Sequence, residues 1–229
     1  MTTPTTADVV IWLGSAAPAR TIRWLDGAIH AGAKLDRTKK TPPERIIALA
    51  AGPGPWLDLV ADRARHAGIG SAGVQTDLVL DYMGWSQIAV GLARFFEAPT
   101  VIVDEASRPE RWVELGPIAD MLDAVTVSNV VKVSSDSDVI QATRVHRDQL
   151  QTMRVRGNAV IGVRIPSPPV DEYPTPLPST TMKKLELDEI GLDYMVLSHR
   201  SLPRRAPLEP RKTVDRVAEH LLVHVRSRS

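Results

Sequence analysis

The stretch RIIALAAGPGP, residues 45–55, decides the fold, because an unbroken apolar run closes on two Gly-Pro pairs. Such a run is typical of a strand that is buried on both faces of a parallel sheet. Residues 9–13, which precede Gly14, and residues 100–103 have the same character. The sequence therefore predicts neighbouring strands of one parallel sheet.

Helical patterns separate these runs. We expect helices over residues 19–33, 56–66, 85–97 and 111–122, and a weaker strand over 74–80. Strands that alternate with helices form βαβ units, which build an open sheet with helices on both faces. The later segments 125–133, 138–147 and 158–165 are strand-like, and their short polar connections favour antiparallel pairing at the edge. The predicted fold class is α/β, with an open, mostly parallel sheet and antiparallel edge strands.

The segment that follows the last predicted strand contains six prolines between residues 166 and 178. Proline lacks an amide donor and fixes φ, so we expect a stiff, extended and projecting loop. Val214, Val217, Leu221 and Val225 share one face of a predicted C-terminal helical arm. We divide the chain into an α/β domain at 1–165, a proline-rich loop at 166–190 and a C-terminal arm at 191–229.

Composition and charge restrict the classes of function. The chain has no cysteine, 28 Lys and Arg residues against 27 Asp and Glu residues, and only short apolar runs. A formal charge of +1 provides no general attraction for nucleic acid or for an anionic membrane. We expect no nucleic-acid partner, no membrane insertion, no signal peptide and a cytoplasmic location.

Two glycine-rich motifs could hold a phosphate. Gly68, Gly70 and Gly73 match G-x-G-x-x-G, but they follow a predicted helix instead of opening one. We therefore interpret Gly68 as a helix cap. Gly52 and Gly54 join a predicted strand to a predicted helix, which is a better context for a phosphate. At this turn, a phosphate site and a plain connection remain equally open.

Candidates for chemistry on side chains are few. Asp104 and Glu105 follow a predicted strand at the edge where α/β sheets bind ligands, yet we favour a solvated acidic turn. His220 and His224 have the spacing of a metal-binding pair, but no third ligand is apparent, and we predict no metal site. Neither a nucleophile elbow nor a Walker A sequence occurs. We therefore predict no catalytic residue and no enzyme.

The order of these segments resembles the beta subunit of electron transfer flavoproteins. The segments that carry the resemblance are IIALAAGP at 46–53, GWSQIA at 84–89, TVIV at 100–103, LGPIADML at 115–122, AVIGV at 159–163, and the stretch 173–192 with LP at 177–178 and MKK at 182–184. The match covers about residues 45–193. The chain also resembles the mycofactocin-associated branch of this family.

The resemblance implies a heterodimer in which the alpha subunit holds most of the FAD. This chain would support the FAD domain and dock a dehydrogenase, so that electrons pass between flavins. The proline-rich loop would be the recognition loop. Leu177 would anchor it in an apolar pocket of the dehydrogenase, with Pro178 and Met182 in supporting positions.

The resemblance also places cofactor-binding positions at Trp12, Ala51, Gly52, Glu114 and Gly116. Trp12 stands where the family has a small residue beside an adenine, and Glu114 replaces a glutamine. Since a carboxylate repels a phosphate, these departures argue against AMP, which the family's beta subunit usually contains. One alternative is a nucleotide-binding regulatory α/β protein that uses the Gly52 turn. In another, less supported by the nucleotide loop, the chain carries a flavin of its own.

Overall fold

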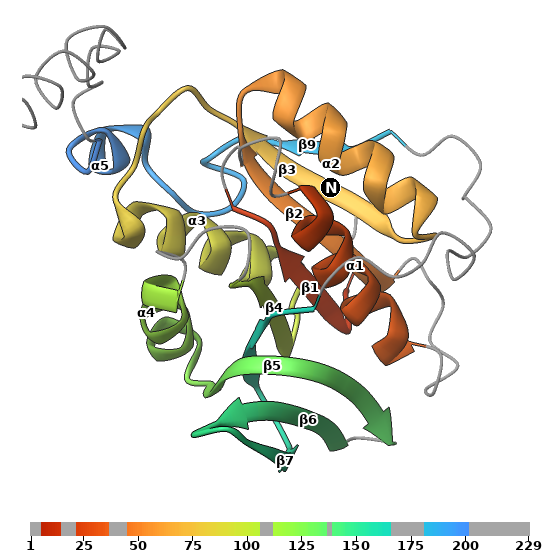
Figure 1. Cartoon of the computed structure of the whole chain (residues 1–229). Coiled ribbons are helices and arrows are strands. Elements are labelled where there is room, and N and C mark those ends of the chain that lie inside the picture. Colours follow the sequence, from red (N-terminus) through yellow and green to blue (C-terminus); the bar gives the residue numbers. More distant parts are fainter. Residues whose placement is uncertain are drawn as a thin grey trace, which may run out of the picture.

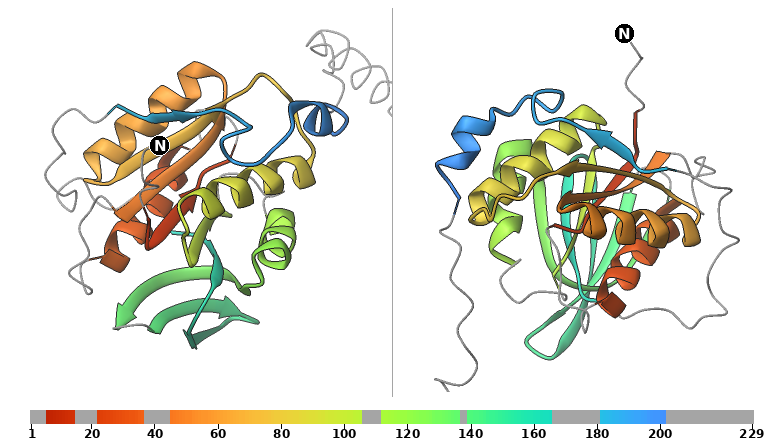
Figure 2. Two further views of the ribbon diagram at one scale, coloured as in Figure 1. Left: turned by 180° about the vertical axis from the view of Figure 1, so that it is seen from behind. Right: turned by 90° about the horizontal axis from the view of Figure 1, so that it is seen from above.

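The computed structural model of the 229-residue chain describes residues 6–14, 22–36, 45–105, 112–136, 139–165 and 181–201 (Figure 1). These residues form one mixed sheet with helices packed on both of its faces (Figure 2). The fold class is α/β, with a mostly parallel sheet that does not close into a barrel, as predicted.

Nine strands are described, in the spatial order β7-β6-β5-β8-β4-β1-β2-β3-β9. Their bounds are β1 Val9–Trp12, β2 Ile46–Gly52, β3 Gly70–Gln75, β4 Thr100–Asp104, β5 Val125–Asp136, β6 Val139–His146, β7 Gln149–Val155, β8 Ala159–Val163 and β9 Lys183–Leu185. All neighbours from β5 through β9 pair in parallel. Strands β6 and β7 add to β5 in antiparallel pairing and form one edge.

The helices make two layers. Helices α1 (Ile22–Asp36) and α2 (Gly54–His66) cover one face, and α3 (Tyr82–Phe95) and α4 (Trp112–Leu122) cover the other, while α5 (Tyr194–Ser198) is a short helix near the end of the described chain. Alternate residues of β1 face opposite layers: Val9 and Ile11 pack with α1 and α2, and Val10 and Trp12 pack with α3 and α4. This alternation explains why β1 is an unbroken apolar run.

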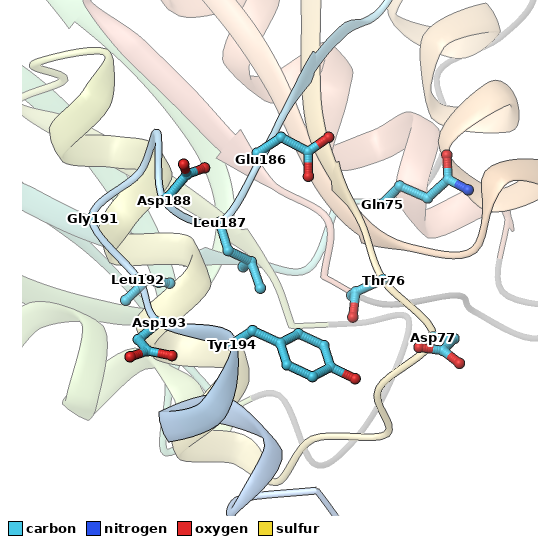
Figure 3. Close-up of a pocket in the computed structure, with 10 residues that line it drawn as sticks. All are labelled: Gln75, Thr76, Asp77, Glu186, Leu187, Asp188, Gly191, Leu192, Asp193 and Tyr194. Atoms are coloured by element: carbon cyan, nitrogen blue, oxygen red, sulfur yellow. The ribbon is translucent and has the colours of Figure 1, made fainter.

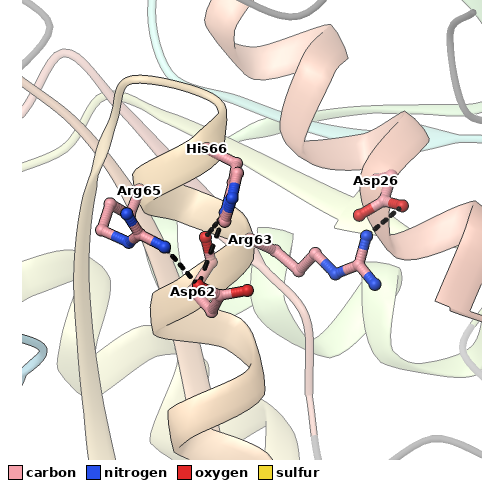
Figure 4. A network of polar contacts seen from close by, with 5 residues as sticks. All are labelled: Asp26, Asp62, Arg63, Arg65 and His66. Atoms are coloured by element: carbon pink, nitrogen blue, oxygen red, sulfur yellow. Dashed lines mark hydrogen bonds and ion pairs between the residues drawn. The ribbon is translucent and has the colours of Figure 1, made fainter. Parts of the chain in front are cut away.

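Helices α1 and α2 are also joined by a polar contact (Figure 4). The Nη1 of Arg63 on α2 lies 3.2 Å from Oδ2 of Asp26 on α1, which is 7% exposed. In the same turn of α2, Arg65 and His66 both contact the exposed Asp62. The hydrogen bond from Arg65 lowers the pKa of Asp62. The contact with Asp26 is the one that links two elements.

Most expected helices are present, with shifted ends. The apolar stripe predicted for 85–97 is buried in one core layer, but α3 begins earlier because Asp81 caps it through a 2.7 Å bond to the Gly84 amide. Helix α1, described as Ile22–Asp36, extends beyond the expected end at residue 33, and α2 begins at Gly54, inside the Gly-Pro turn. Proline is tolerated there because the first helical amides lack intrahelical partners.

The weaker strand expected at 74–80 is displaced. The strand is β3, Gly70–Gln75, and a loop follows it until Leu80 makes an isolated bridge with Ser201. Small residues hid this strand from propensity arguments, yet its backbone packs closely on β2. A Cβ atom on Gly73 would lie 2.7 Å from the Ala50 carbonyl oxygen.

The prediction of antiparallel pairing at the edge is confirmed for segments 125–133 and 138–147 but is wrong for segment 158–165. Strand β8 is parallel and interior, between β4 and β5, and all its residues are buried. The edge strand is β7, which the sequence did not predict because its apolar residues Leu150, Met153 and Val155 are separated by polar ones. Strand β6 joins β7 through Arg147 and Asp148, which both have positive φ, as in a type I′ turn.

The second edge strand, β9, was also not expected. Residues 183–185 pair in parallel with β3, so part of the segment predicted as loop 166–190 belongs to the sheet. The rest of that loop, including Leu177 and Pro178, lies outside the described residues. So does the C-terminal arm from residue 202, with His220 and His224. Among the helices that the structure describes, none has the length and apolar character needed to cross a membrane.

Candidate functional site

The direction of strand addition changes beside β1. The chain proceeds from β1 to β2 and β3 on one side, and β4 then pairs with the other side of β1. In open α/β sheets, ligands bind outside the carboxyl ends of the strands at such a switch point. Here β1 ends at Trp12 and β4 ends at Asp104, followed by Glu105.

Two of the predicted cofactor-binding residues meet at this point. The buried indole Nε1–H of Trp12 donates to Oε2 of Glu114 at 2.9 Å, although the residues are 102 positions apart in the chain. Trp12 is 0% exposed, and Glu114, in the first turn of α4, is 7% exposed. A carboxylate near a helix N-terminus also interacts favourably with the helix dipole. The indole and the carboxylate thus bind each other and are not directed at a ligand.

Backbone carbonyl groups at the Gly52 turn form hydrogen bonds within the chain. Ala51 is fully buried, and Gly52 has a φ of +143°, which an L-residue rarely adopts. The Gly52 carbonyl accepts from the Thr76 amide at 3.0 Å. On the adjoining strand, the Gly14 carbonyl accepts from Trp56 Nε1 at 2.9 Å.

The N-terminus of α2 is a poor phosphate cradle. Pro53 and Pro55 have no amide hydrogen, and the Trp56 amide already donates to the Pro53 carbonyl at 3.0 Å. In the first turn, at most the Gly54 amide is left to donate a hydrogen bond to a ligand. A phosphate site uses several converging amides. The structure therefore favours the plain connection at this turn.

Gly116 does not join the others. It lies on α4, is exposed, and has nothing within 4 Å of where a Cβ atom would stand. Gly68 has the role that we preferred for it: with φ +71°, it terminates α2. The amides of Gly68 and Ile69 donate to the carbonyls of Arg65 and Ala64, which is a Schellman cap. Gly70 and Gly73 belong to β3.

The prediction of a solvated turn at Asp104 and Glu105 was wrong. The two residues are 1% and 2% exposed. A Glu105 oxygen accepts from the Asn129 amide at 2.7 Å, where β5 is irregular and Asn129 has a φ of +58°. The Glu105 side chain occupies the space next to Gly162 of β8, which a Cβ atom would fill. Glu105 therefore ties β4 to β5 and β8.

Burial raises the pKa of Glu105 above its ordinary value. The Asn129 amide and the Arg164 guanidinium oppose this effect, and the Asp104 charge adds to it. Local sequence could not indicate this burial, because it depends on the bulge in β5 and on the missing side chain at Gly162. A buried carboxyl of this kind can hold a proton, but its contacts are with the protein's own backbone.

Met182 is another correction. Its side chain is 7% exposed and belongs to the core layer under α2. It lies directly before β9, and its sulfur would be 3.2 Å from a Cβ atom on Gly73. Met182 thus attaches the chain to the sheet and is not a surface contact for a docking protein.

A groove of about 770 Å³ was missed by the sequence arguments (Figure 3). It lies beyond the carboxyl end of β3, between the loop that carries Thr76 and Asp77 and the stretch from Glu186 to Tyr194. The acidic pattern of residues 186–193 was the available signal. Its neighbour across the groove is more than a hundred positions away, so the sequence alone did not show that they meet.

The predicted cofactor residues do not fit AMP. Trp12 and Glu114 bond to each other, Ala51 is buried, and Gly116 is exposed on α4, so the side chains of these residues supply no phosphate donor. In the part of the chain that the structure describes, no three acidic or histidine side chains gather in a way that could hold a metal ion.

No protein-family model matches the chain, and no curated protein matches it.

Proposed function

We propose that this chain is a beta-like subunit of a heterodimeric electron transfer flavoprotein, located in the cytoplasm. The alpha subunit would hold the FAD, and this chain would support the FAD domain and dock a dehydrogenase. Electrons would then pass between flavins through proximity, while the protein supplies positioning.

The observation that carries the proposal is the placement of the resembling segments. IIALAAGP, GWSQIA, TVIV, LGPIADML and AVIGV lie on β2, α3, β4, α4 and β8, and MKK lies at the start of β9. These elements belong to one α/β fold, which supports a single resemblance over separate chance matches.

The carboxyl edge of the sheet supports the division of labour between the subunits. Trp12 and Glu114 use the space and the polar groups at the switch point, and the Gly52 carbonyl is bonded to Thr76. In the proposal, a chain whose described residues at this edge bond to each other contributes support and docking, and its partner holds most of the cofactor. The proposed role does not require any described side chain to make or break a covalent bond.

The test is co-expression of the full chain with an alpha-type electron transfer flavoprotein subunit. We expect a stable heterodimer with stoichiometric FAD, measured by size-exclusion chromatography and by flavin absorbance after denaturation. The control is each subunit purified alone and incubated with FAD; this chain should then retain none. Absence of a complex, or a complex without flavin, would contradict the proposal.

The alternative of a nucleotide-binding regulatory protein is weakened by the α2 N-terminus, which offers at most one amide. It is separated from the main proposal by mass spectrometry of small molecules released when the purified chain is denatured. An adenine nucleotide bound without any flavoprotein partner would favour the alternative.

A further inference from the structure

Helix α5 presents an uncovered apolar surface. Tyr194, Met195 and Val196 are 52%, 62% and 56% exposed, and of its five residues only Leu197 is buried. Val79 and Tyr82, in and just after the loop that follows β3, are 45% and 49% exposed. We call these five residues the α5 surface. Exposed apolar residues that gather in this way mark interaction sites more often than isolated ones do.

The two segments of the α5 surface are fastened to each other. Leu80 bridges to Ser201, and the Asp81 amide donates to the Arg200 carbonyl at 3.2 Å. The Arg200 guanidinium also lies 3.7 Å from the Asp81 carboxylate. The α5 surface is therefore held in place by backbone and side-chain contacts on both sides, so docking would require little ordering of this chain.

The groove described above continues from this surface (Figure 3). Tyr194 belongs to both, and its ring is directed toward the loop with Thr76 and Asp77. Four of the described residues that line the groove are acidic, and none of the described lining residues is Lys, Arg or His. The four are Asp77, Glu186, Asp188 and Asp193.

Backbone contacts hold some of these carboxylates without neutralising them. Asp193 Oδ1 accepts from the Met195 amide at 2.7 Å, and Asp188 Oδ1 accepts from the Glu189 amide at 2.9 Å. Amide donors fix a carboxylate in position but leave its negative charge. An acidic or purely apolar occupant would meet repulsion or an unpaid desolvation cost there.

We propose that the α5 surface and the groove dock a segment of a second protein that combines apolar side chains with Lys or Arg. Apolar side chains would cover Met195 and Val196, and the cations would lie over the groove carboxylates. Charge complementarity selects this occupant over an acidic one. The inference does not depend on the proposed function, because it rests on the groove and on α5 alone.

The test uses the full chain and three labelled synthetic peptides with the same apolar pattern, carrying Lys, Gln or Glu at the other positions. Fluorescence anisotropy should show that the Lys peptide binds about tenfold more tightly than the Gln peptide, and that the Glu peptide binds least. Added salt should reduce the difference between Lys and Gln peptides. Equal binding of all three peptides would overturn the proposal.

Matched variants locate the binding. Glu186→Gln with Asp188→Asn should weaken Lys-peptide binding about tenfold while Gln-peptide binding stays unchanged. Met195→Gln with Val196→Gln should weaken both. The controls are exposed carboxylates on other elements, Asp120→Asn with Asp148→Asn, which should have no effect. Loss of binding in the controls, or none in the groove variants, would contradict the assignment.

Competition with the chain's own basic tail is the remaining outcome. A peptide of residues 202–216 carries Arg204, Arg205, Arg211, Lys212 and Arg216. If it binds the groove and the Lys peptide does not, the occupant is the same chain, and a second protein is ruled out. Binding of the Lys peptide would stand even if no flavoprotein complex forms on co-expression, so the two proposals can fail separately.

Discussion

At the scale of single residues, the Trp12–Glu114 bond fixes helix α4 to the end of the central strand. Both partners are buried, so the bond is made in a region of low dielectric. Loss of the donor there would leave a buried acceptor unpaired and would lower the free energy of unfolding. The bond also joins two side chains that come from distant parts of the sequence to the same point at the carboxyl edge of the sheet.

Removing the Trp12 donor should lower the free energy of unfolding more than changing the Glu114 acceptor. Trp12→Phe keeps an aromatic ring but removes the Nε1–H, and it should lower the free energy of unfolding by about 1–3 kcal/mol. Glu114→Gln keeps a carbonyl that can accept from the indole, and it should cost less than about 1 kcal/mol. Urea denaturation monitored by circular dichroism measures both. Equal losses for the two variants would contradict this role.

Glu105 should make stability depend on pH. Its folded pKa is raised above 4.5, so below pH 4.5 the carboxyl is protonated whether the chain is folded or unfolded, and no buried charge opposes folding. As the pH rises through the folded pKa, the folded protein must hold that charge, and stability is lost. Glu105→Gln can still accept from the Asn129 amide and carries no charge.

The Glu105→Gln variant should therefore gain stability relative to the natural chain as the pH rises from 4.5 to about 8. Urea midpoints at the two pH values give the comparison. Asp58→Asn, at an exposed position, is the control and should show no such trend. A difference between Glu105→Gln and the natural chain that does not change with pH would disprove the linkage.

The role of a residue could be predicted where it depends on neighbours within a few positions in the sequence. Gly68 was assigned as a cap because the helix ends within one turn of it, and the Schellman bonds confirm this. The burial of Glu105 depends on Asn129 and Gly162, which lie far away in the sequence. The pairing of Trp12 with Glu114 was equally nonlocal: each residue was noted, but nothing indicated that they touch.

At the scale of elements, β9 is short and depends on its surroundings. It has three residues, pairs only with β3, and is preceded by Met182 in the core. A strand this short has few ladder bonds of its own, so close packing of β3, Met182 and Leu57 around Gly73 must contribute to its stability.

Gly73→Ala should disturb this packing. The new Cβ atom would lie 2.7 Å from the Ala50 carbonyl oxygen, which belongs to the backbone and cannot move freely. We expect a loss of about 1–3 kcal/mol in the free energy of unfolding. Gly70→Ala is the matched control, since its nearest neighbour would be 3.5 Å away, and it should change stability by less than about 0.5 kcal/mol. Thermal or urea unfolding that ranks the two variants in the opposite order would refute this account.

Elements with strong apolar runs or a clear helical stripe were predicted well. Strands β1, β2 and β4 are buried throughout, and the α3 stripe lies in the core. Strand β7 was missed because Leu150, Met153 and Val155 form neither a continuous apolar run nor a strict alternation. The interior position of β8 could have been inferred, because AVIGV is as unbroken as the runs of the central strands.

At the scale of the whole molecule, Met182 and Leu177 should behave in opposite ways. Met182→Ala removes a core side chain and should lower the free energy of unfolding by about 2–5 kcal/mol. In the proposed heterodimer, Leu177→Ala should leave stability and assembly unchanged, but should reduce electron transfer from the proposed dehydrogenase at least about tenfold at subsaturating carrier. Stopped-flow reduction of the bound flavin measures the transfer. An unchanged rate for Leu177→Ala would exclude the docking role.

The position of β9 also affects how the protein is made. It comes from the last described part of the chain, yet it covers an edge of the sheet that was completed at residue 75. During synthesis on the ribosome, β3 cannot pair with β9 until more than a hundred further residues have been made. Unpaired strand edges invite association with other nascent chains. Slow translation near residues 181–185 would thus prolong the period in which this protein is most exposed to aggregation and to chaperone capture.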